Sequence, residues 1–361
     1  MVKVPEYIHS LIPYKAGKTL EDINRLSFAK LASNENPLGC SPKALAAMTE
    51  NLHQGHLYPD PSATALIQKL AEHHGVKPEN LACANGSDAL LEYAVMTFSA
   101  AGDEILTSEG TFIGIYVIIK KLGRQAVLTP LHEWSYDLTR MLSMITPKTK
   151  VIYVANPNNP TGTHISKQAL QNFLAEVPKD ILVILDEAYY EYASSSADYP
   201  DGSKLSQENL LVLRTFSKSY GLAGLRVGYA IGDKEVVSAL RKVKLPFEPS
   251  RIAQVAALHA IEDRDFLAKT LATNKISKEI LREELEASGY TFVESIANFF
   301  MIYFDRAETA KRFHDVCTEK GLYLRHLAGF GLPRCVRINS GTKEQSIFAA
   351  NILNEAARLI P

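Results

Sequence analysis

Residues 210–226 read LLVLRTFSKSYGLAGLR, a short apolar run followed by a polar loop that carries Lys218 between two serines and ends at Arg226. A strand buried on both faces of a parallel sheet reads as such a run, and ligands bind at the carboxyl ends of these strands. Lysine in a desolvated, cation-rich loop is a candidate nucleophile toward an aldehyde. The alternative is an ordinary surface lysine, which convergence of Lys218 and Arg226 on one phosphate would disfavour.

Similar apolar runs recur along the chain, at residues 104–107, 125–128, 151–154, 181–185, 210–213 and 227–231. Helix-like stretches separate most of them, and this spacing predicts βα units that build a mainly parallel sheet. The last two runs are separated only by a loop, so we expect that pair to be antiparallel.

The flanking segments differ from this block. Residues 1–45 are rich in turn formers and predict an irregular arm, whereas residues 234–287 are helical in composition with interruptions at Pro246 and Pro249. Residues 292–304 and 322–338 predict short strands around a helix. We therefore expect an N-terminal arm (1–45) that associates with a small C-terminal α+β domain (251–361), and a large domain (46–250) between them.

Composition narrows the function classes. The chain of 361 residues has 39 Lys and Arg against 40 Asp and Glu, a net charge of −1 that argues against nucleic-acid binding. No apolar run is long enough to span a membrane, and the first residues lack the apolar core of a signal peptide. The four cysteines form no CxxC pair, which suits reduced thiols in the cytoplasm, so neither disulfides nor a metal site is expected.

Three more polar motifs adjoin the apolar elements. Asp186-Glu187-Ala188-Tyr189 follows the run at 181–185, and its carboxylate either faces a ligand or caps the next helix. The sequence NPNNPTG at 156–162 follows the run at 151–154. It is either a second candidate site at the carboxyl end of a strand or only a turn. Residues 85–88, NGSD, precede and begin an apolar helix, and the first backbone N–H groups of such a helix can bind a phosphate. The alternative is that these residues only form the N-cap of the helix.

Together these motifs resemble those of the fold-type I aminotransferases that depend on pyridoxal phosphate. The sequence is most similar to the members that act on histidinol phosphate, and the resemblance runs from about Pro13 to Gly341. It implies an α/β fold, in which a large domain with a mainly parallel seven-stranded sheet flanked by helices joins a smaller α+β domain. The motifs that carry it are Ile12-Pro13-Tyr14, Gly17-Lys18, Ser33-Asn34-Glu35-Asn36-Pro37, Tyr58-Pro59-Asp60, Asn85-Gly86-Ser87-Asp88, Asn159-Pro160-Thr161-Gly162, Asp186-Glu187-Ala188-Tyr189 and Ala297-Asn298-Phe299.

The resemblance implies roles for the residues that match. Lys218 would bind pyridoxal 5'-phosphate covalently and then move a proton of the substrate, while Asp186 would keep the pyridine nitrogen protonated. Asn159 and Tyr189 would hydrogen-bond the phenolic oxygen, and Phe112 stands where the family often has a tyrosine stacked on the ring.

The phosphate of the cofactor would be held by residues from two loops. Asp88 is a carboxylate, so we expect it to cap its helix rather than touch the anion. The residues expected around the phosphate are Gly86, Ser87, Asp88, Ser217 and Arg226, together with Tyr58, which in this family reaches across a homodimer interface.

Substrate groups are expected from the small domain and the arm. By resemblance, Arg325 and Arg337 grip the phosphate of histidinol phosphate and the carboxylates of glutamate or 2-oxoglutarate, although a structural salt bridge would also explain either arginine. Tyr14 and Asn34 are candidates for closing over the imidazole end.

The function implied is transfer of an amino group between histidinol phosphate and 2-oxoglutarate, giving imidazole-acetol phosphate and glutamate in histidine biosynthesis. An aromatic amino acid aminotransferase and a threonine-phosphate decarboxylase on the same fold are the alternatives, followed by a non-enzymatic regulator that binds the cofactor. The segment 246–250, PFEPS, replaces a tyrosine-asparagine pair that many members carry, so substrate choice depends on the pocket itself.

Overall fold

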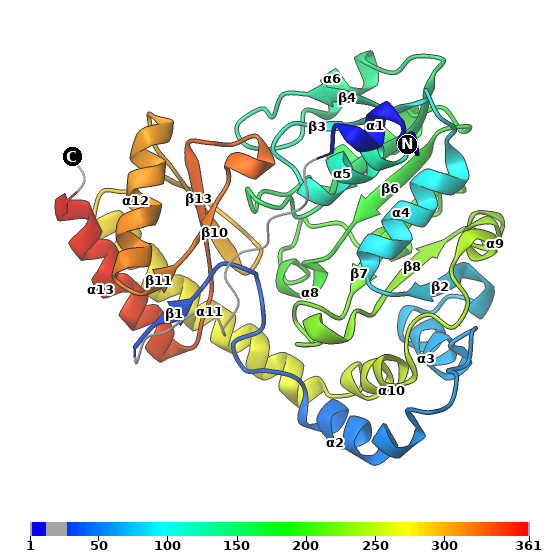
Figure 1. Ribbon diagram of the computed structural model, residues 1–361, viewed down its shortest axis with the longest axis horizontal. Coiled ribbons are helices and arrows are strands. Elements are labelled where there is room, and N and C mark those ends of the chain that lie inside the picture. The colour runs from blue at the N-terminus through cyan, green and yellow to red at the C-terminus, as the bar shows by residue number, and fades with distance from the viewer. Residues whose placement is uncertain (1, 12–26, 360–361) are drawn as a thin grey trace.

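The computed structural model describes residues 2–11 and 27–359, which form a large lobe around a central sheet and a smaller lobe that holds the C-terminal helix (Figure 1). Tyr14, a candidate substrate contact, lies outside the described residues.

The large lobe contains a seven-stranded sheet in the order β2-β8-β7-β6-β5-β3-β4. Strands β3 to β7 run parallel, while β8 is antiparallel to both β7 and β2. The predicted α/β class and the antiparallel last pair are confirmed. The strands are β2 (Leu81–Ala84), β3 (Glu104–Ser108), β4 (Gln125–Thr129), β5 (Thr149–Ala155), β6 (Leu182–Asp186), β7 (Leu210–Thr215) and β8 (Gly228–Gly232).

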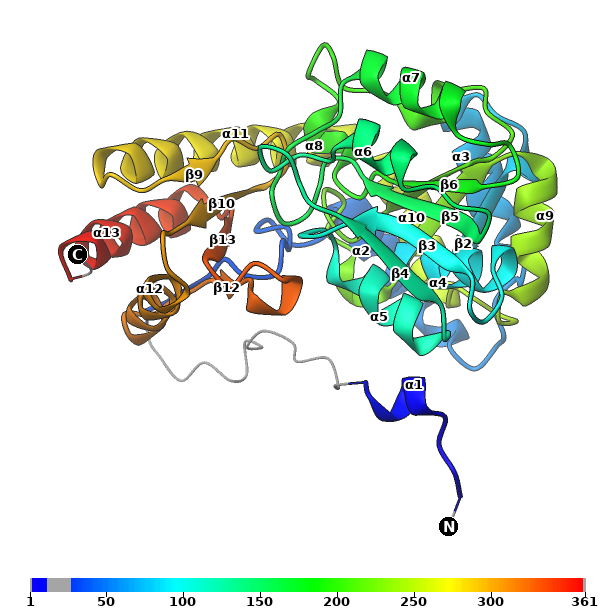
Figure 2. The same cartoon turned by 90° about the horizontal axis from the view of Figure 1, so that it is seen from above.

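Helices cover both faces of this sheet, which explains the uninterrupted apolar strands. Helices α4 (Ser87–Phe98) and α5 (Ile113–Lys121) lie on one side and α7 (Lys167–Glu176) on the other (Figure 2). The connection from β3 to β4 and the connection from β5 to β6 run in opposite directions across the sheet. Because crossovers between parallel strands are right-handed, the helices in these two connections cover opposite faces. The loops that follow β3, β5, β6 and β7 therefore open at one edge.

The helical stretch after β8 breaks where the prolines predicted a break. It forms α9 (Lys234–Val243), α10 (Arg251–Ala260) and α11 (Arg264–Ala287). Ser250 caps α10 by accepting a hydrogen bond from the backbone of Ala253, so the new helix begins directly after Pro249. The alanines of α10 are buried in the same apolar core as the sheet, and α10 packs on α2 (Pro42–Asn51). We therefore propose that the large domain extends to about residue 261, beyond the boundary at 250 expected from the sequence.

The small lobe contains a four-stranded antiparallel sheet in the order β12-β13-β10-β9. Segment 27–41 reaches this lobe, where β1 (Ala29–Lys30) pairs in parallel with β11 (Leu322–Tyr323). The remaining elements of the lobe are β9 (Phe292–Val293), β10 (Phe299–Tyr303), α12 (Ala307–Glu319), β12 (Arg325–His326), β13 (Cys335–Asn339) and α13 (Lys343–Leu359).

The other helices are α1 (Glu6–His9), α3 (Thr64–His74), α6 (Leu138–Ser143) and α8 (Tyr190–Ala193). Within the described ranges, every helix is too short or too polar to cross a lipid bilayer.

Candidate active site

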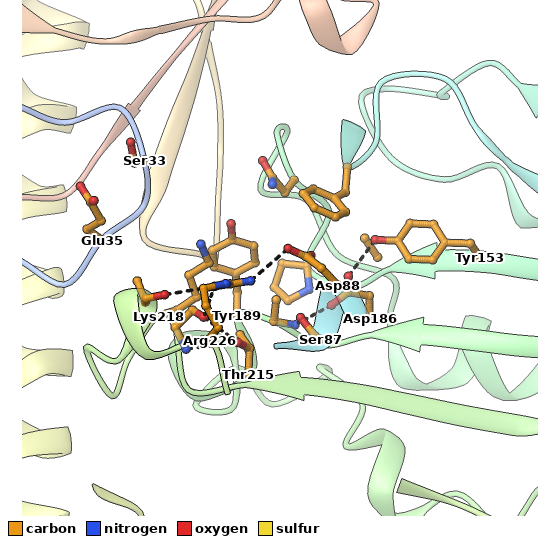
Figure 3. Close-up of a pocket in the computed structure, with 17 residues that line it drawn as sticks. Ser33, Glu35, Ser87, Asp88, Tyr153, Asp186, Tyr189, Thr215, Lys218 and Arg226 are labelled. Carbon is orange, nitrogen blue, oxygen red and sulfur yellow. Dashed lines mark hydrogen bonds and ion pairs between the residues drawn. The ribbon is translucent and has the colours of Figure 1, made fainter. Parts of the chain in front are cut away.

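A cavity of about 250 Å³ opens where β3, β5, β6 and β7 end (Figure 3). Its walls bring together most of the side chains that the sequence predicted for a cofactor site, although these are spread over more than a hundred positions. The predicted residues that line it are Ser87, Asp88, Phe112, Asn159, Asp186, Tyr189, Ser217, Lys218 and Arg226.

Lys218 lies in the loop after β7, and this loop is fixed from two sides. The hydroxyl of Ser219 donates to the buried carboxylate of Glu191 at 2.8 Å, and the amide of Asn36 donates to the Ser219 carbonyl at 2.9 Å. Gly221 has a φ of +70°, and any Cβ there would collide with the Gly39 carbonyl oxygen, so the turn requires glycine. The Lys218 amine lies 5.8 Å from the centre of the Tyr189 ring.

Asp186 ends β6 at the base of the cavity and is only 8% exposed. One carboxylate oxygen accepts from the backbone N–H of Ala188 at 3.1 Å, and the other accepts from the hydroxyl of Tyr153 at 2.8 Å. Burial raises the pKa of Asp186 to about 6 despite these bonds. A buried carboxylate of this kind is stabilised in its ionised form by a cation placed against it, as a protonated pyridine nitrogen would be.

Contacts to two lining residues, Asn159 and Tyr189, join the two lobes beside the cavity. Arg337 in β13 is buried and donates to the side-chain oxygen of Asn159 and, at 2.9 Å, to the Ala32 carbonyl. Asn34 donates to the Tyr189 hydroxyl at 2.6 Å, and its own side-chain oxygen is buried without a hydrogen-bond partner. That oxygen is an acceptor at the edge of the site.

The first turn of α4 and the loop after β7 form an anion cradle. Arg226 contacts the Ser217 hydroxyl at 3.3 Å and Asp88 at 3.2 Å, and its side chain is about half exposed. Gly86 has a φ of +89°, and a Cβ there would lie 2.7 Å from a terminal nitrogen of Arg226. Free backbone N–H groups, a hydroxyl and a guanidinium thus converge, as binding of a phosphate requires.

The expectation that Asp88 caps its helix is wrong. The N-cap of α4 is Gly86, which makes no side-chain cap, and the Asp88 carboxylate instead pairs with Arg226. An acidic side chain in the first turn still complements the helix dipole, which explains why the sequence suggested a cap.

Within the described segments, five predicted residues are not among those that line the cavity: Tyr58, Gly86, Asn34, Arg325 and Arg337. Asn34 and Arg337 contact the lining residues Tyr189 and Asn159. Tyr58 is 76% exposed and stacks on Phe247, with ring centres 4.3 Å apart. Arg325 in β12 is the direct cross-strand partner of Arg337 in β13, so both side chains start from the same face of the small sheet.

The sequence did not indicate Tyr153, which lines the cavity and contacts Asp186. Its signal is weak because an aromatic residue within an apolar strand normally belongs to the core. Only the pairing of β5 with β6 brings its hydroxyl to the carboxylate.

These residues fit pyridoxal phosphate. A buried carboxylate occupies one part of the cavity, an anion cradle another, and the Lys218 amine and the apolar ring of Phe112 lie in the same walls. Burial raises the pKa of Asp186 in the pocket, and the side-chain oxygen of Asn34, whose amide contacts the lining residue Tyr189, is buried and unpaired. Polar groups in and beside the pocket thus lack a full set of protein partners.

Comparison with known proteins gives a consistent result. Residues 27–351 match the family model for class I and II aminotransferases. The histidinol-phosphate aminotransferase of Anaeromyxobacter sp. is 40% identical over 353 residues, covering 96% of this chain and 96% of the relative. That of Halalkalibacterium halodurans is 38% identical, covering 96% of this chain and 94% of the relative. The crystal structure of histidinol-phosphate aminotransferase from Sinorhizobium meliloti in complex with pyridoxal-5'-phosphate is 30% identical and covers 100% of this chain and 99% of its own, with a TM-score of 0.92.

Proposed function

The chain belongs to the class I and II aminotransferases, and we propose that it transfers the amino group of histidinol phosphate to 2-oxoglutarate in histidine biosynthesis. The products are imidazole-acetol phosphate and glutamate. It is an enzyme that depends on pyridoxal phosphate. The observation that carries the proposal is the convergence of Lys218, Asp186 and Arg226 on one cavity.

When bound, pyridoxal phosphate supplies an electron sink for the electron pair left at the substrate Cα. The Lys218 Nζ would hold the cofactor covalently and, once free, would accept the proton from the substrate Cα. The Lys218 loop, fixed through Ser219 and Asn36, keeps this amine in place during both tasks. A base that is held within reach avoids the entropic cost of recruiting one from solution.

Asp186 holds the proton on the ring nitrogen. Two charges 4 Å apart at an effective dielectric near 20 attract each other by about 4 kcal/mol, which corresponds to roughly three pKa units on the nitrogen. Asn159 and Tyr189 orient the phenolic oxygen, while Ser87, Ser217, Arg226 and the backbone at Gly86 and Asp88 bind the phosphate. Phe112 covers the ring with its apolar face.

The arginine pair supports a dianionic substrate group. Arg325 and Arg337 are direct cross-strand partners on one face of the small sheet, and an anion held near that face would be attracted by both guanidinium groups. A guanidinium binds phosphate and carboxylate oxygens in the same forked geometry, which suits an enzyme that alternates between histidinol phosphate and glutamate. Asn34 and Tyr14, from the arm, complete the proposed contacts near the imidazole.

We also propose a homodimer in which Tyr58 reaches the cofactor phosphate of the partner subunit. The support is the exposure of Tyr58 together with that of nearby apolar side chains: Leu52 and Leu57 in the preceding segment, Phe247, which stacks on Tyr58, and Leu245, two residues before Phe247. Apolar groups gathered in this way mark an interaction surface. We place the reaction in the cytoplasm, because the four cysteines are free thiols, as is usual there.

A substrate panel tests the function. The reconstituted protein is assayed with histidinol phosphate, phenylalanine, tyrosine and threonine phosphate, each with 2-oxoglutarate as acceptor. We expect kcat/KM to be highest for histidinol phosphate, while release of carbon dioxide from threonine phosphate, or a preference for an aromatic amino acid, would overturn the substrate assignment.

Attachment of the cofactor is tested separately. Reduction with borohydride should fix it on the peptide that contains Lys218, and Lys218→Ala should abolish both this adduct and turnover. Full cofactor binding without turnover of any substrate would indicate a regulator instead of an enzyme.

A further inference from the structure

A buried hydrogen bond connects Asp186 to the neighbouring strand. The hydroxyl of Tyr153 in β5 lies 2.8 Å from the carboxylate of Asp186 in β6, and Tyr153 is fully buried (Figure 3). Tyr153 also lines the cavity.

The register of the sheet makes this contact possible. Tyr153 pairs with Ile184 and Ala155 with Asp186, so all four side chains lie on one face, because alternate residues of a strand point to the same side. Tyr153 is therefore the diagonal neighbour of Asp186 across the two strands, and its long aromatic side chain can reach the carboxylate. The residue directly beside Asp186 is Ala155, whose small side chain leaves room for the phenol.

The bond has a fixed direction. Burial raises the pKa of Tyr153 well above its ordinary value, so the phenol stays protonated and donates its single O–H. The second oxygen of Asp186 accepts from the backbone of Ala188. Both donors favour the ionised carboxylate, and together they fix the plane in which its remaining lone pairs point.

We propose that Tyr153 is a positioning residue that holds Asp186 ionised and correctly oriented, and thereby keeps the ring nitrogen of pyridoxal phosphate protonated. The inference rests on the proposed role of Asp186. It assigns Tyr153 an effect on the chemistry that a tyrosine of the core would not have.

The chain offers a matched control. Tyr136 is also buried close to the cavity, but its hydroxyl donates to Thr111 at 2.6 Å and accepts from the backbone of Ala155 at 3.2 Å. Tyr136→Phe therefore removes the same atom from the same core while leaving the Asp186 carboxylate with both of its donors.

The test is the protonation state of the ring nitrogen, measured by NMR on enzyme loaded with cofactor labelled with ¹⁵N at that position. In the wild type we expect the protonated signal across neutral pH. A hydrogen bond to a charged group is worth about 1.5–3 kcal/mol, so Tyr153→Phe should shift the proton shared by the ring nitrogen and Asp186 toward the carboxylate by about tenfold to a hundredfold, and the protonated nitrogen signal at neutral pH should fall accordingly. Tyr136→Phe should leave that signal unchanged.

Kinetics and cofactor affinity give independent readouts. Tyr153→Phe should lower kcat about tenfold to a hundredfold with little change in KM, and should weaken cofactor binding to the apoprotein. In an Asp186→Asn background the same substitution should have no further effect on the ring nitrogen, since the residue through which Tyr153 acts is then neutral.

The outcomes separate the two levels of the proposal. If the wild-type nitrogen is protonated and Tyr153→Phe behaves like Tyr136→Phe, the role of Tyr153 is overturned while the function stands. If the wild-type nitrogen is not protonated, the role of Asp186 fails as well. If Tyr153→Phe does not fold, Tyr153→Met, which fills similar space without the donor, replaces it.

Discussion

Asp186 decides how cofactor binding depends on pH. Burial raises its pKa to about 6, so in the protein without cofactor this carboxylate takes up a proton as the pH falls through that value. The ionised form is the one that attracts a protonated pyridine nitrogen, and we expect the dissociation constant for pyridoxal phosphate to rise as the pH falls below about 6. The measurement is a cofactor titration of the apoprotein between pH 5 and 8, about one unit or more on either side of this pKa.

Asp186→Asn is the control for that titration. The variant should bind pyridoxal phosphate weakly at every pH and should show no further loss of affinity at acidic pH. The ionisations of the cofactor itself affect both proteins equally, so the difference between the two titrations reports on Asp186. The folding stability of the apoprotein depends on pH in the opposite direction to its affinity for the cofactor. A raised pKa favours the folded apoprotein below the pKa of the unfolded chain, and that stability is lost as the pH rises through about 6. The thermal stabilisation by cofactor should therefore grow with pH, and an equal stabilisation at pH 5 and 8 would contradict this account.

Arg337 tests the substrate side of the site. Lysine keeps the charge but loses the planar fork that binds two oxygens, so Arg337→Lys should raise KM for histidinol phosphate about tenfold to a hundredfold. The matched control is Arg334→Lys, since Arg334 lies on the same segment but is exposed, and its side chain donates to the Asp305 carbonyl at 3.4 Å. Unchanged KM values for both histidinol phosphate and glutamate in Arg337→Lys would remove it from the proposed substrate contacts.

The residues of the site differ in how well the sequence reveals them. Lys218 and Asp186 follow apolar strands, so chain order alone places them at the carboxyl edge of a parallel sheet. Tyr153 lies inside such a strand, and its contact depends on which strand pairs with β5 and in what register. Asp88 was misjudged because its partner Arg226 is distant in sequence, and pairing across that distance is a property of the folded chain.

At the level of elements, the junction of β2 and α4 is sensitive to substitution. Gly86 needs a positive φ, and a methyl group there would displace Arg226 from the anion cradle. Gly86→Ala should raise the dissociation constant for pyridoxal phosphate about tenfold or more, because a charge-assisted contact to the phosphate is lost. Binding is measured by titration of the apoprotein.

Gly102→Ala separates the clash from the backbone strain. Gly102 has a nearly identical φ of +91°, but a Cβ there would meet nothing within 4 Å. Both variants should lose similar stability on heating, of the order of 1–2 kcal/mol, whereas only Gly86→Ala should lose cofactor affinity. Equal affinities in the two variants would show that Arg226 does not depend on the space at Gly86.

The elements themselves were predictable where they are long, apolar and buried. Strands β3 to β8 match the predicted runs closely. For the buried strands of this set the reason is that a strand covered on both faces needs no polar residues, whereas β4 is largely exposed. The short β2, with the sequence LACA, was not predicted, since two alanines carry little strand preference and its place is set by pairing with β8. Likewise, no local feature of α10 shows that its alanines pack against α2 in the large lobe.

On the scale of the whole molecule, the site depends on three distant parts of the chain. Asn34 from the arm bonds to Tyr189, and Arg337 from the small lobe bonds to Asn159. These contacts couple the position of the small lobe to Tyr189 and Asn159, the groups proposed to orient the cofactor. Within the described residues, Tyr58 is the predicted phosphate contact whose ring is mostly exposed, and this is the observation that a dimer would explain.

Mixed dimers test that explanation. Tyr58→Ala and Lys218→Ala are each expected to lower activity as pure proteins, the first partly and the second completely. If Tyr58 serves the partner's cofactor, a hybrid contains one site with both groups intact, supplied by Lys218 of one subunit and Tyr58 of the other. Random mixing should then restore about a quarter of the wild-type activity, since half of the dimers are hybrid and each has one complete site. The control is a mixture of Lys218→Ala with Asp186→Asn, in which both defects affect the site of their own subunit, so no complete site can form. Hybrids that assemble, as shown by native mass spectrometry, but recover no more activity than this control would place Tyr58 outside the partner's site.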